Sequence, residues 1–317
     1  MQQEVISPIR RPNLRRFLVY TLALIGVLAL VTVAVAFWQT RDSPKFTINE
    51  NNMIDSVMLR TYGKYSDEHK GWLYVGNGNR TYVMRIVQQA KIESEGMVGD
   101  ELYFVASGTP VDGLSGTVYG VFQIRSDGKP TNASAIEVSS PFIYAEAVPI
   151  NPENIHFEVL SQRNWGWVIK VKYGTDPKAG PVHVVNQIYT PRNNDIALLG
   201  AFNASYEYDP GIDCAEANRK YDEWLNRDRK PEAAEQEESN NSPDTNNEDE
   251  EPRRCSKAKW TYKTGNSSSD AFVPIMVTGK GILEGKPVAE KTIKVMFDNK
   301  SFVYLIPNEL TYQLVTP

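Results

Sequence analysis

Cysteine and histidine are scarce in this chain, and their scarcity argues against several kinds of site. The 317 residues include only two cysteines and three histidines. Two cysteines cannot complete a structural zinc site, and no histidine lies in a zinc-enzyme spacing such as H-E-x-x-H. Gly76 and Gly78 lack the third glycine of a dinucleotide-binding fingerprint, and no convergent catalytic set is present. We therefore expect no metal, no cofactor and no enzymatic activity.

The chain also lacks the basic excess that is typical of nucleic-acid-binding domains. Its net charge is −5, and residues 231–252 alone contribute nine acidic residues and no basic one. Residues 1–16 carry four arginines against one glutamate, so the remaining residues are close to neutral. Nucleic-acid binding requires a clustered basic surface. We therefore expect no nucleic-acid partner.

Only one long apolar run occurs, and it lies near the N-terminus. The segment Phe17–Trp38 holds 22 residues without a charge. As a helix it reaches roughly 33 Å, enough to cross a hydrocarbon core of about 30 Å. Four arginines precede it, which predicts a cytoplasmic N-terminus by the positive-inside tendency: Arg10, Arg11, Arg15 and Arg16. We expect a single-pass protein of the inner (cytoplasmic) membrane with an extracytoplasmic domain, periplasmic in a Gram-negative cell.

An alternative interpretation of the same segment is a signal peptide cleaved after Ala36, because Ala34-Val35-Ala36 fits an A-x-A site. A signal-peptide apolar region is usually about 7–15 residues, which is shorter than this one. The segment also ends in Phe37-Trp38, an aromatic pair typical of the membrane interface. We favour the uncleaved anchor, and both interpretations export the domain.

If the domain is exported, its two cysteines, Cys214 and Cys255, lie in an oxidising compartment. An isolated pair in an oxidising compartment favours a disulfide, and a loop of about 40 residues would contribute roughly 4 kcal/mol in a chain-entropy estimate. The alternative is two free thiols, because the sequence does not give the distance between the two Cα atoms.

Two amphipathic helices are predicted beyond the anchor. The first begins with a capping box, Thr47 as N-cap and Glu50 at the third helical position, and extends to about Tyr62. Its apolar stripe is Ile54, Val57, Met58 and Tyr62. The second begins at Asp213 and carries the stripe Cys214, Ala217, Tyr221, Trp224 and Leu225.

Strand patterns dominate the rest, and short turn-rich connections favour antiparallel pairing. The predicted strands are 72–75, 81–89, 101–107, 117–125, 156–162, 165–174, 183–190, 197–208, 259–265, 271–285, 289–299 and 301–308. Met296–Phe302 contains the tip of a hairpin, and Pro274 limits its strand to an edge or a bulge. The fold class is therefore α+β: a transmembrane helix followed by a mostly antiparallel, β-rich domain with two helices.

The predicted organisation has six segments. They are a cytoplasmic tail (1–16), a transmembrane helix (17–38), a linker (39–46), the β-rich domain (47–228), a disordered acidic insertion (229–254) and C-terminal strands that complete the domain (255–317). Low hydrophobicity and like charge predict the disorder of the insertion. We favour a passive solvated insertion, and the alternatives are an acidic recruitment loop and a weak calcium collector.

Our leading hypothesis is a non-enzymatic subunit or adaptor of a cell-envelope assembly, in secretion, transport or surface-structure biogenesis. Its partners would be the bilayer and other envelope proteins, and a homo-oligomer is left open. The alternative is a membrane-anchored ligand-binding or sensory domain. Its pocket would be lined by strand aromatics, although such residues are more often core: Trp72, Tyr74, Trp165 and Trp167.

Overall fold

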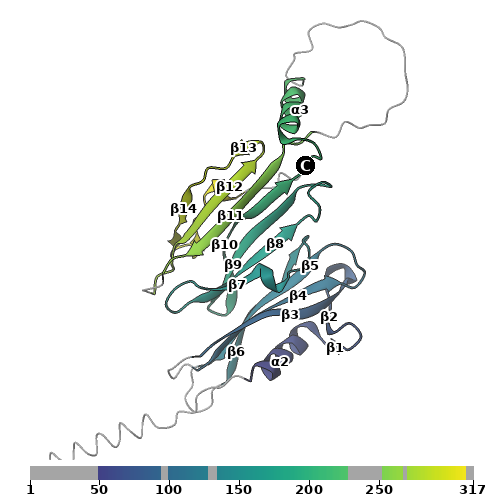
Figure 1. Cartoon of the computed structure of the whole chain (residues 1–317). Coiled ribbons are helices and arrows are strands. Elements are labelled where there is room, and N and C mark those ends of the chain that lie inside the picture. Colours follow the sequence, from purple (N-terminus) through teal and green to yellow (C-terminus); the bar gives the residue numbers. More distant parts are fainter. Residues whose placement is uncertain (1–48, 94–98, 128–133, 228–251, 267–269, 312–317) are drawn as a thin grey trace, which may run out of the picture.

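The computed structural model describes residues 49–93, 99–127, 134–227, 252–266 and 270–311 (Figure 1). Within these ranges the chain is β-rich with two helices, and all its strand pairs are antiparallel, which confirms the α+β class. The predicted anchor Phe17–Trp38 and its four arginines lie outside these ranges. Of the helices inside them, neither is long and apolar enough to cross a membrane.

The first sheet is a six-stranded antiparallel meander. Its strands follow in chain order: β1 (Tyr65–Ser66), β2 (Gly71–Val75), β3 (Thr81–Ile92), β4 (Glu101–Pro110), β5 (Thr117–Ser126) and β6 (Ala135–Ala145). A short 3₁₀ turn, η1 (Asn77–Asn79), connects β2 and β3. Sequence patterns predicted β2 to β5 but not β6.

Helix α2 (Glu50–Tyr62) packs on one face of this sheet. Its predicted stripe is confirmed, because the buried residues of the helix are Ile54, Val57, Met58 and Tyr62. The predicted N-cap, Thr47, is wrong and lies outside the described ranges. The cap is Asn49, whose extended backbone lets its side chain accept a hydrogen bond from the Asn52 amide at 3.3 Å.

The first sheet curls around the end of α2. Phe142 on β6 stacks on Tyr74 of β2 with ring centroids 4.8 Å apart, and the hydroxyls of Tyr74 and Tyr144 lie 2.6 Å apart. These contacts join strands four places apart in the sheet order. Tyr62, at the end of α2, fills the space between them and donates a hydrogen bond to the Pro141 carbonyl at 2.7 Å.

Gly120 on β5 lets Tyr62 pass close to the sheet. A Cβ atom there would lie 2.2 Å from the Tyr62 hydroxyl and 2.9 Å from the Pro141 carbonyl oxygen. We expect Gly120→Ala to lower the free energy of unfolding by about 1–3 kcal/mol, because overpacking displaces Tyr62. Urea unfolding followed by circular dichroism measures the change. Gly180→Ala is the matched control, since a Cβ there meets no atom within 4 Å; equal effects would contradict the prediction.

The second sheet has eight strands. In chain order they are β7 (Ile155–Val159), β8 (Trp165–Tyr173), β9 (Val182–Arg192), β10 (Asp195–Tyr208), β11 (Ser256–Thr264), β12 (Ile275–Leu283), β13 (Lys286–Pro287) and β14 (Thr292–Val295). A separate hairpin of β15 (Phe297–Asp298) and β16 (Val303–Tyr304) follows, within the predicted hairpin region. The 3₁₀ turns are η2 (Pro152–Asn154) and η3 (Asn308–Leu310). Strand β12 starts directly after Pro274, and the predicted 289–299 strand is divided between β14 and β15.

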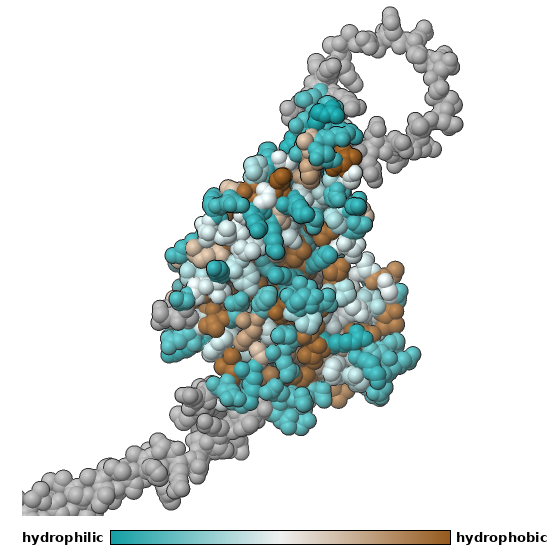
Figure 2. Space-filling view, in the orientation of Figure 1, coloured by the Kyte–Doolittle hydropathy of each residue, from teal (hydrophilic) through white to brown (hydrophobic). Residues whose placement is uncertain are grey.

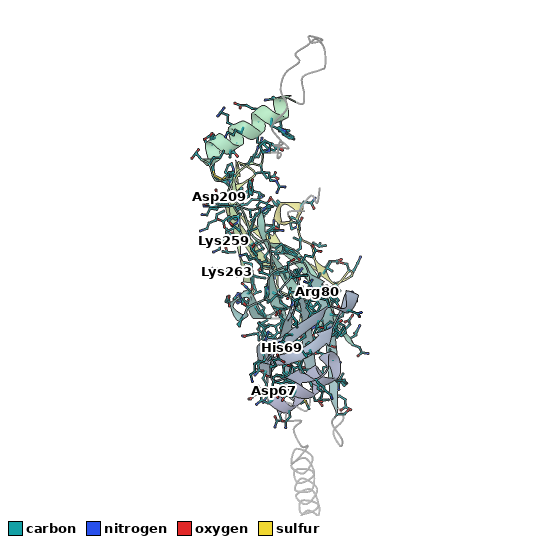
Figure 3. The ribbon with its side chains drawn as sticks, turned by 90° about the vertical axis from the view of Figure 1, so that its right-hand side faces the viewer. Asp67, His69, Arg80, Asp209, Lys259 and Lys263 are labelled. Carbon is teal, nitrogen blue, oxygen red and sulfur yellow. A yellow bond between two sulfur atoms is a disulfide. The ribbon has the colours of Figure 1, made fainter. Side chains whose placement is uncertain are left out.

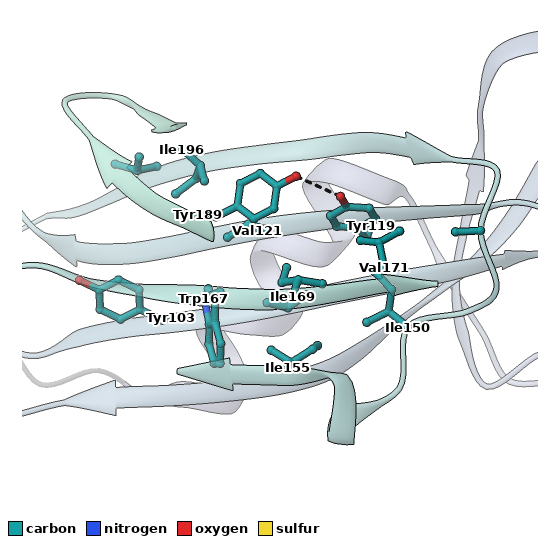
Figure 4. Packing of buried hydrophobic residues seen from close by; sticks show 13 residues of the cluster. Tyr103, Tyr119, Val121, Ile150, Ile155, Trp167, Ile169, Val171, Tyr189 and Ile196 are labelled. Carbon is teal, nitrogen blue, oxygen red and sulfur yellow. Dashed lines mark hydrogen bonds between the residues drawn. The ribbon is translucent and has the colours of Figure 1, made fainter. Parts of the chain in front are cut away.

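The two sheets pack face to face, and their shared core contains Trp167 at its centre (Figure 4). The first sheet contributes Tyr103, Tyr119 and Val121, and the second contributes Trp167 and Tyr189 among others. The hydroxyls of Tyr119 and Tyr189 lie 3.0 Å apart within this core. Burial raises the pKa of Tyr189 to about 12, so both hydroxyls remain protonated donors at neutral pH.

Helix α3 (Cys214–Arg227) leaves the end of β10 and is joined to the start of β11 by the predicted disulfide. Cys214 and Cys255 are bonded, with Cα atoms 5.2 Å apart, which confirms that prediction. The Asp213 carboxylate caps the helix by accepting from the Ala215 amide at 2.8 Å. Most of the acidic segment that the disulfide encloses, residues 228–251, lies outside the described ranges.

Candidate functional site

The four aromatic residues predicted to line one pocket lie in two different environments. Trp72 and Tyr74 pack on the α2 face of the first sheet, whereas Trp165 and Trp167 lie on β8 and face the shared core. Trp167 is 1% exposed. Of the four, Trp165 lines a cavity of about 300 Å³ between the ends of the two sheets.

That small cavity is polar. Glu101 accepts hydrogen bonds from the Tyr103 hydroxyl at 2.6 Å and from the Gln123 amide at 2.9 Å. Burial, reinforced by the negative charge of Glu101, raises the pKa of Tyr103 well above its usual range. One carboxylate oxygen, Oε2, thus accepts both hydrogen bonds from the cavity wall, and these bonds link β4 to β5.

A larger cavity of about 620 Å³ lies between β7, β8 and β9 on one side and β11 on the other. We call it the β7–β11 cleft. Its walls include His156 and Glu158 on β7, Lys170 on β8, Asn186 on β9, and a run of β11 from Lys259 to Thr264. Figure 3 labels Lys259 and Lys263, which lie on the same half of the molecule. The cleft therefore draws polar and charged groups from four strands.

The curl of the second sheet creates this cleft. Glu158 on β7 accepts hydrogen bonds from Tyr262 at 3.0 Å and from Thr264 at 3.1 Å, both on β11. Strands β7 and β11 are four places apart in the sheet order, so the sheet must bend strongly to bring them together. A register shift in β10 between Asn203 and Ser205 accompanies the bend, and β11 pairs only with the residues after it.

Asn186 is the most unusual residue of the cleft. It is 1% exposed, and its side-chain oxygen Oδ1 accepts no hydrogen bond. In register it lies between Lys170 on β8 and Phe202 on β10, so its side chain is on the face that the cleft occupies. Buried polar atoms in proteins are nearly always paired, and an unpaired acceptor at a cavity wall is a place for a ligand donor.

The charge of the cleft is predominantly positive. Three lysines line it, Lys170, Lys259 and Lys263, against the single carboxylate of Glu158. Burial, followed by the charge of Glu158, raises the pKa of Tyr262 well above its usual range. Tyr262 therefore stays a neutral donor to Glu158, and this pair fixes one wall. The arrangement can hold an anion beside the lysines and a donor group at Asn186.

Sequence reasoning did not identify this cleft. The signal that it contained was Asn186 itself, a polar residue in the middle of the apolar strand HVVNQIYT, on the same face as Ile188. No three histidine, cysteine or acidic side chains lie close enough to hold a metal ion within the ranges that the structure covers. Comparisons of the whole chain with protein-family models, with curated proteins and with solved structures find no match.

Proposed function

We propose that the protein is a non-enzymatic, single-pass membrane protein that acts as a subunit or adaptor of a cell-envelope assembly. Phe17–Trp38 would anchor it in the inner membrane, with the N-terminus in the cytoplasm. The β-rich domain would lie outside the cytoplasm and contact other envelope proteins.

The disulfide Cys214–Cys255 is the observation that carries the proposed location. Structural disulfides form and persist in oxidising compartments and are rare in the cytosol. Export of the β-rich domain across the membrane accounts for both this bond and the apolar segment that precedes the domain.

The arrangement of the domain supports a role in contacts with partners. Helix α2, the first described element after the apolar segment, lies at one end of the molecule and α3 at the opposite end (Figure 1). Anchoring through the N-terminus would therefore hold α3 and β11 to β14 away from the bilayer. On the face seen in Figure 2, hydrophobic residues are interspersed with hydrophilic ones over both sheets.

The second candidate function is a membrane-anchored ligand-binding or sensory domain. The β7–β11 cleft favours it, because its walls combine a buried unpaired acceptor with three lysines. A sensor of this kind would transmit its signal through a partner protein, so the two functions are compatible.

Native membranes solubilised gently, followed by capture through a C-terminal tag and mass spectrometry, test the adaptor proposal. We expect a reproducible, stoichiometric set of envelope proteins. The control is a different single-pass protein carrying the same tag, which separates partners from proteins that bind the tag or the detergent micelle. Recovery of the chain alone would contradict the adaptor and favour the ligand-binding domain.

A C-terminal fusion to alkaline phosphatase tests the location separately, because that reporter needs disulfides to become active. We expect activity in the full-length fusion. The matched control is the same fusion without residues 1–38, which retains the β-rich domain and should be inactive. Inactivity of the full-length fusion at normal expression would contradict export.

A further inference from the structure

The β7–β11 cleft carries an inference beyond the adaptor role. Its floor contains Asn186, whose Oδ1 atom is buried and accepts no hydrogen bond. The alternation of β9 directs this side chain to the same face as Lys170 on β8. A group that donates an O–H or N–H hydrogen bond would satisfy this oxygen, whereas an apolar group in the cleft would leave it unpaired.

The rim of the cleft is built to attract negative charge. Lys259 and Lys263 lie four residues apart on the exposed face of β11, opposite to the face of Tyr262 and Thr264, and both border the cleft; Lys170 lines it from β8. None of the three forms an ion pair with a carboxylate in the part of the chain that the structure describes. Lys259 also lies directly opposite Lys280 on β12, a like-charged pair that an anion would stabilise.

The one carboxylate of the cleft does not neutralise these lysines. Both oxygens of Glu158 accept hydrogen bonds from β11, one from Tyr262 and one from Thr264. Glu158 is thereby held in place on the wall, and the lysine ammonium groups remain available to a ligand. The cleft thus presents cations at its rim and a hydrogen-bond acceptor at its floor.

We propose that the β7–β11 cleft binds a small hydroxylated organic anion, of the class of sugar phosphates and sugar acids. The phosphate or carboxylate would lie among Lys170, Lys259 and Lys263, and a hydroxyl would donate to Asn186 Oδ1. Lysine binds phosphate and carboxylate as a point charge, so the shared chemistry of the two anions is sufficient here. The proposal does not depend on the adaptor function.

Binding is tested on the full chain in detergent with glucose 6-phosphate and gluconate at millimolar concentration, by calorimetry and by the shift of the unfolding temperature. The two probes distinguish a phosphate from a carboxylate ligand. Glucose alone supplies the hydroxyls without the charge. Inorganic phosphate alone supplies the charge without the hydroxyls. We expect glucose 6-phosphate, gluconate or both to bind about tenfold more tightly than glucose or inorganic phosphate.

Two variants locate the site. Lys259→Gln with Lys263→Gln removes two rim charges, and we expect it to weaken binding of the probe by about tenfold or more. The matched control is Lys178→Gln with Lys300→Gln, which removes two charges from exposed turns outside the cleft. The control should retain binding within about twofold, because screened charges outside the cleft contribute little.

Asn186→Leu separates a ligand-binding role from a structural one. Leucine is similar in size and removes the unpaired acceptor, so we expect a higher unfolding temperature without probe together with loss of probe binding. A purely structural asparagine predicts a lower unfolding temperature instead. Failure of both probes to bind, equal affinity for inorganic phosphate, or equal losses in the β11 double variant and its control would each overturn the proposal.

Discussion

Replacement of Trp167 by alanine is expected to lower the free energy of unfolding by about 3–5 kcal/mol, among the largest effects of any single substitution in this chain. The indole is 1% exposed and lies in the core shared by the two sheets, with its ring centroid 4.7 Å from that of Phe157. Its removal would leave a cavity bounded by both sheets, which cannot collapse without moving one sheet relative to the other.

Two further variants make this prediction specific. Trp165→Ala, on the same strand and face, should cost much less, because Trp165 is only half-buried at the sheet ends. Trp167→Phe should also cost less than alanine, since it keeps most of the packing and removes an indole N–H that has no hydrogen-bond partner. Urea unfolding monitored by circular dichroism gives the three values, and equal losses for Trp165→Ala and Trp167→Ala would contradict the prediction.

These tryptophans illustrate what the sequence predicts and what it leaves open. The alternation of side chains along the predicted strand 165–174 puts Trp165 and Trp167 on one face of β8. It could not distinguish a pocket wall from a core, because that depends on the sheet opposite, which is far away in the sequence. For the same reason, the sequence could not show that Trp72 and Tyr74 lie on a different sheet from Trp165 and Trp167.

Helix α2 was predictable because its signal is local. The spacing of Ile54, Val57, Met58 and Tyr62 follows the 3.6-residue period, and all four are buried. The cap was not predictable to the residue, since Thr47 and Asn49 are both good N-cap types and the choice depends on where the chain meets the sheet.

Strand β6 was missed because its alternation is interrupted. Ile136 and Val138 face the shared core at even positions, whereas Ile143 and Ala145 face it at odd positions. The change of parity occurs at Pro141, where two residues of β6 lie opposite Gly120 in a register shift. A pattern of period two cannot cross such a bulge, so the segment did not resemble a strand.

The β7–β11 cleft depends on a bend that no local pattern records. Its residues come from strands separated by up to about a hundred positions, and Glu158 reaches Tyr262 only because β10 shifts register before β11 begins to pair. The individual lysines are ordinary for the exposed face of a strand. They form a candidate site because they line the same cavity as Asn186, whose side-chain oxygen is buried and unpaired.

Removal of the disulfide, like removal of the Trp167 side chain, is expected to have one of the two largest effects on the free energy of unfolding. Cys255 directly precedes Ser256, and Ser256 pairs with Tyr208 at the end of β10. The bond therefore closes nearly the same loop that must close when β10 and β11 pair, over a sequence separation of 41. Without the disulfide, the pairing of β10 with β11 must overcome the full entropy cost of closing this loop in the unfolded chain. That cost is about 4 kcal/mol for a loop of this length.

We therefore expect Cys214→Ala with Cys255→Ala to lower the free energy of unfolding by about 2–5 kcal/mol, measured by urea unfolding of the full chain in detergent. Wild-type protein in reductant should show the same loss, and the double variant should not respond to reductant at all, which controls for the substitutions themselves. Removal of residues 231–252 from the disulfide-bonded chain shortens the closed loop and should reduce the contribution of the bond only slightly, since closure entropy varies with the logarithm of loop length. Unchanged stability after reduction would contradict the argument. It would mean that β10 and β11 stay paired without the bond, and that the disulfide holds only α3.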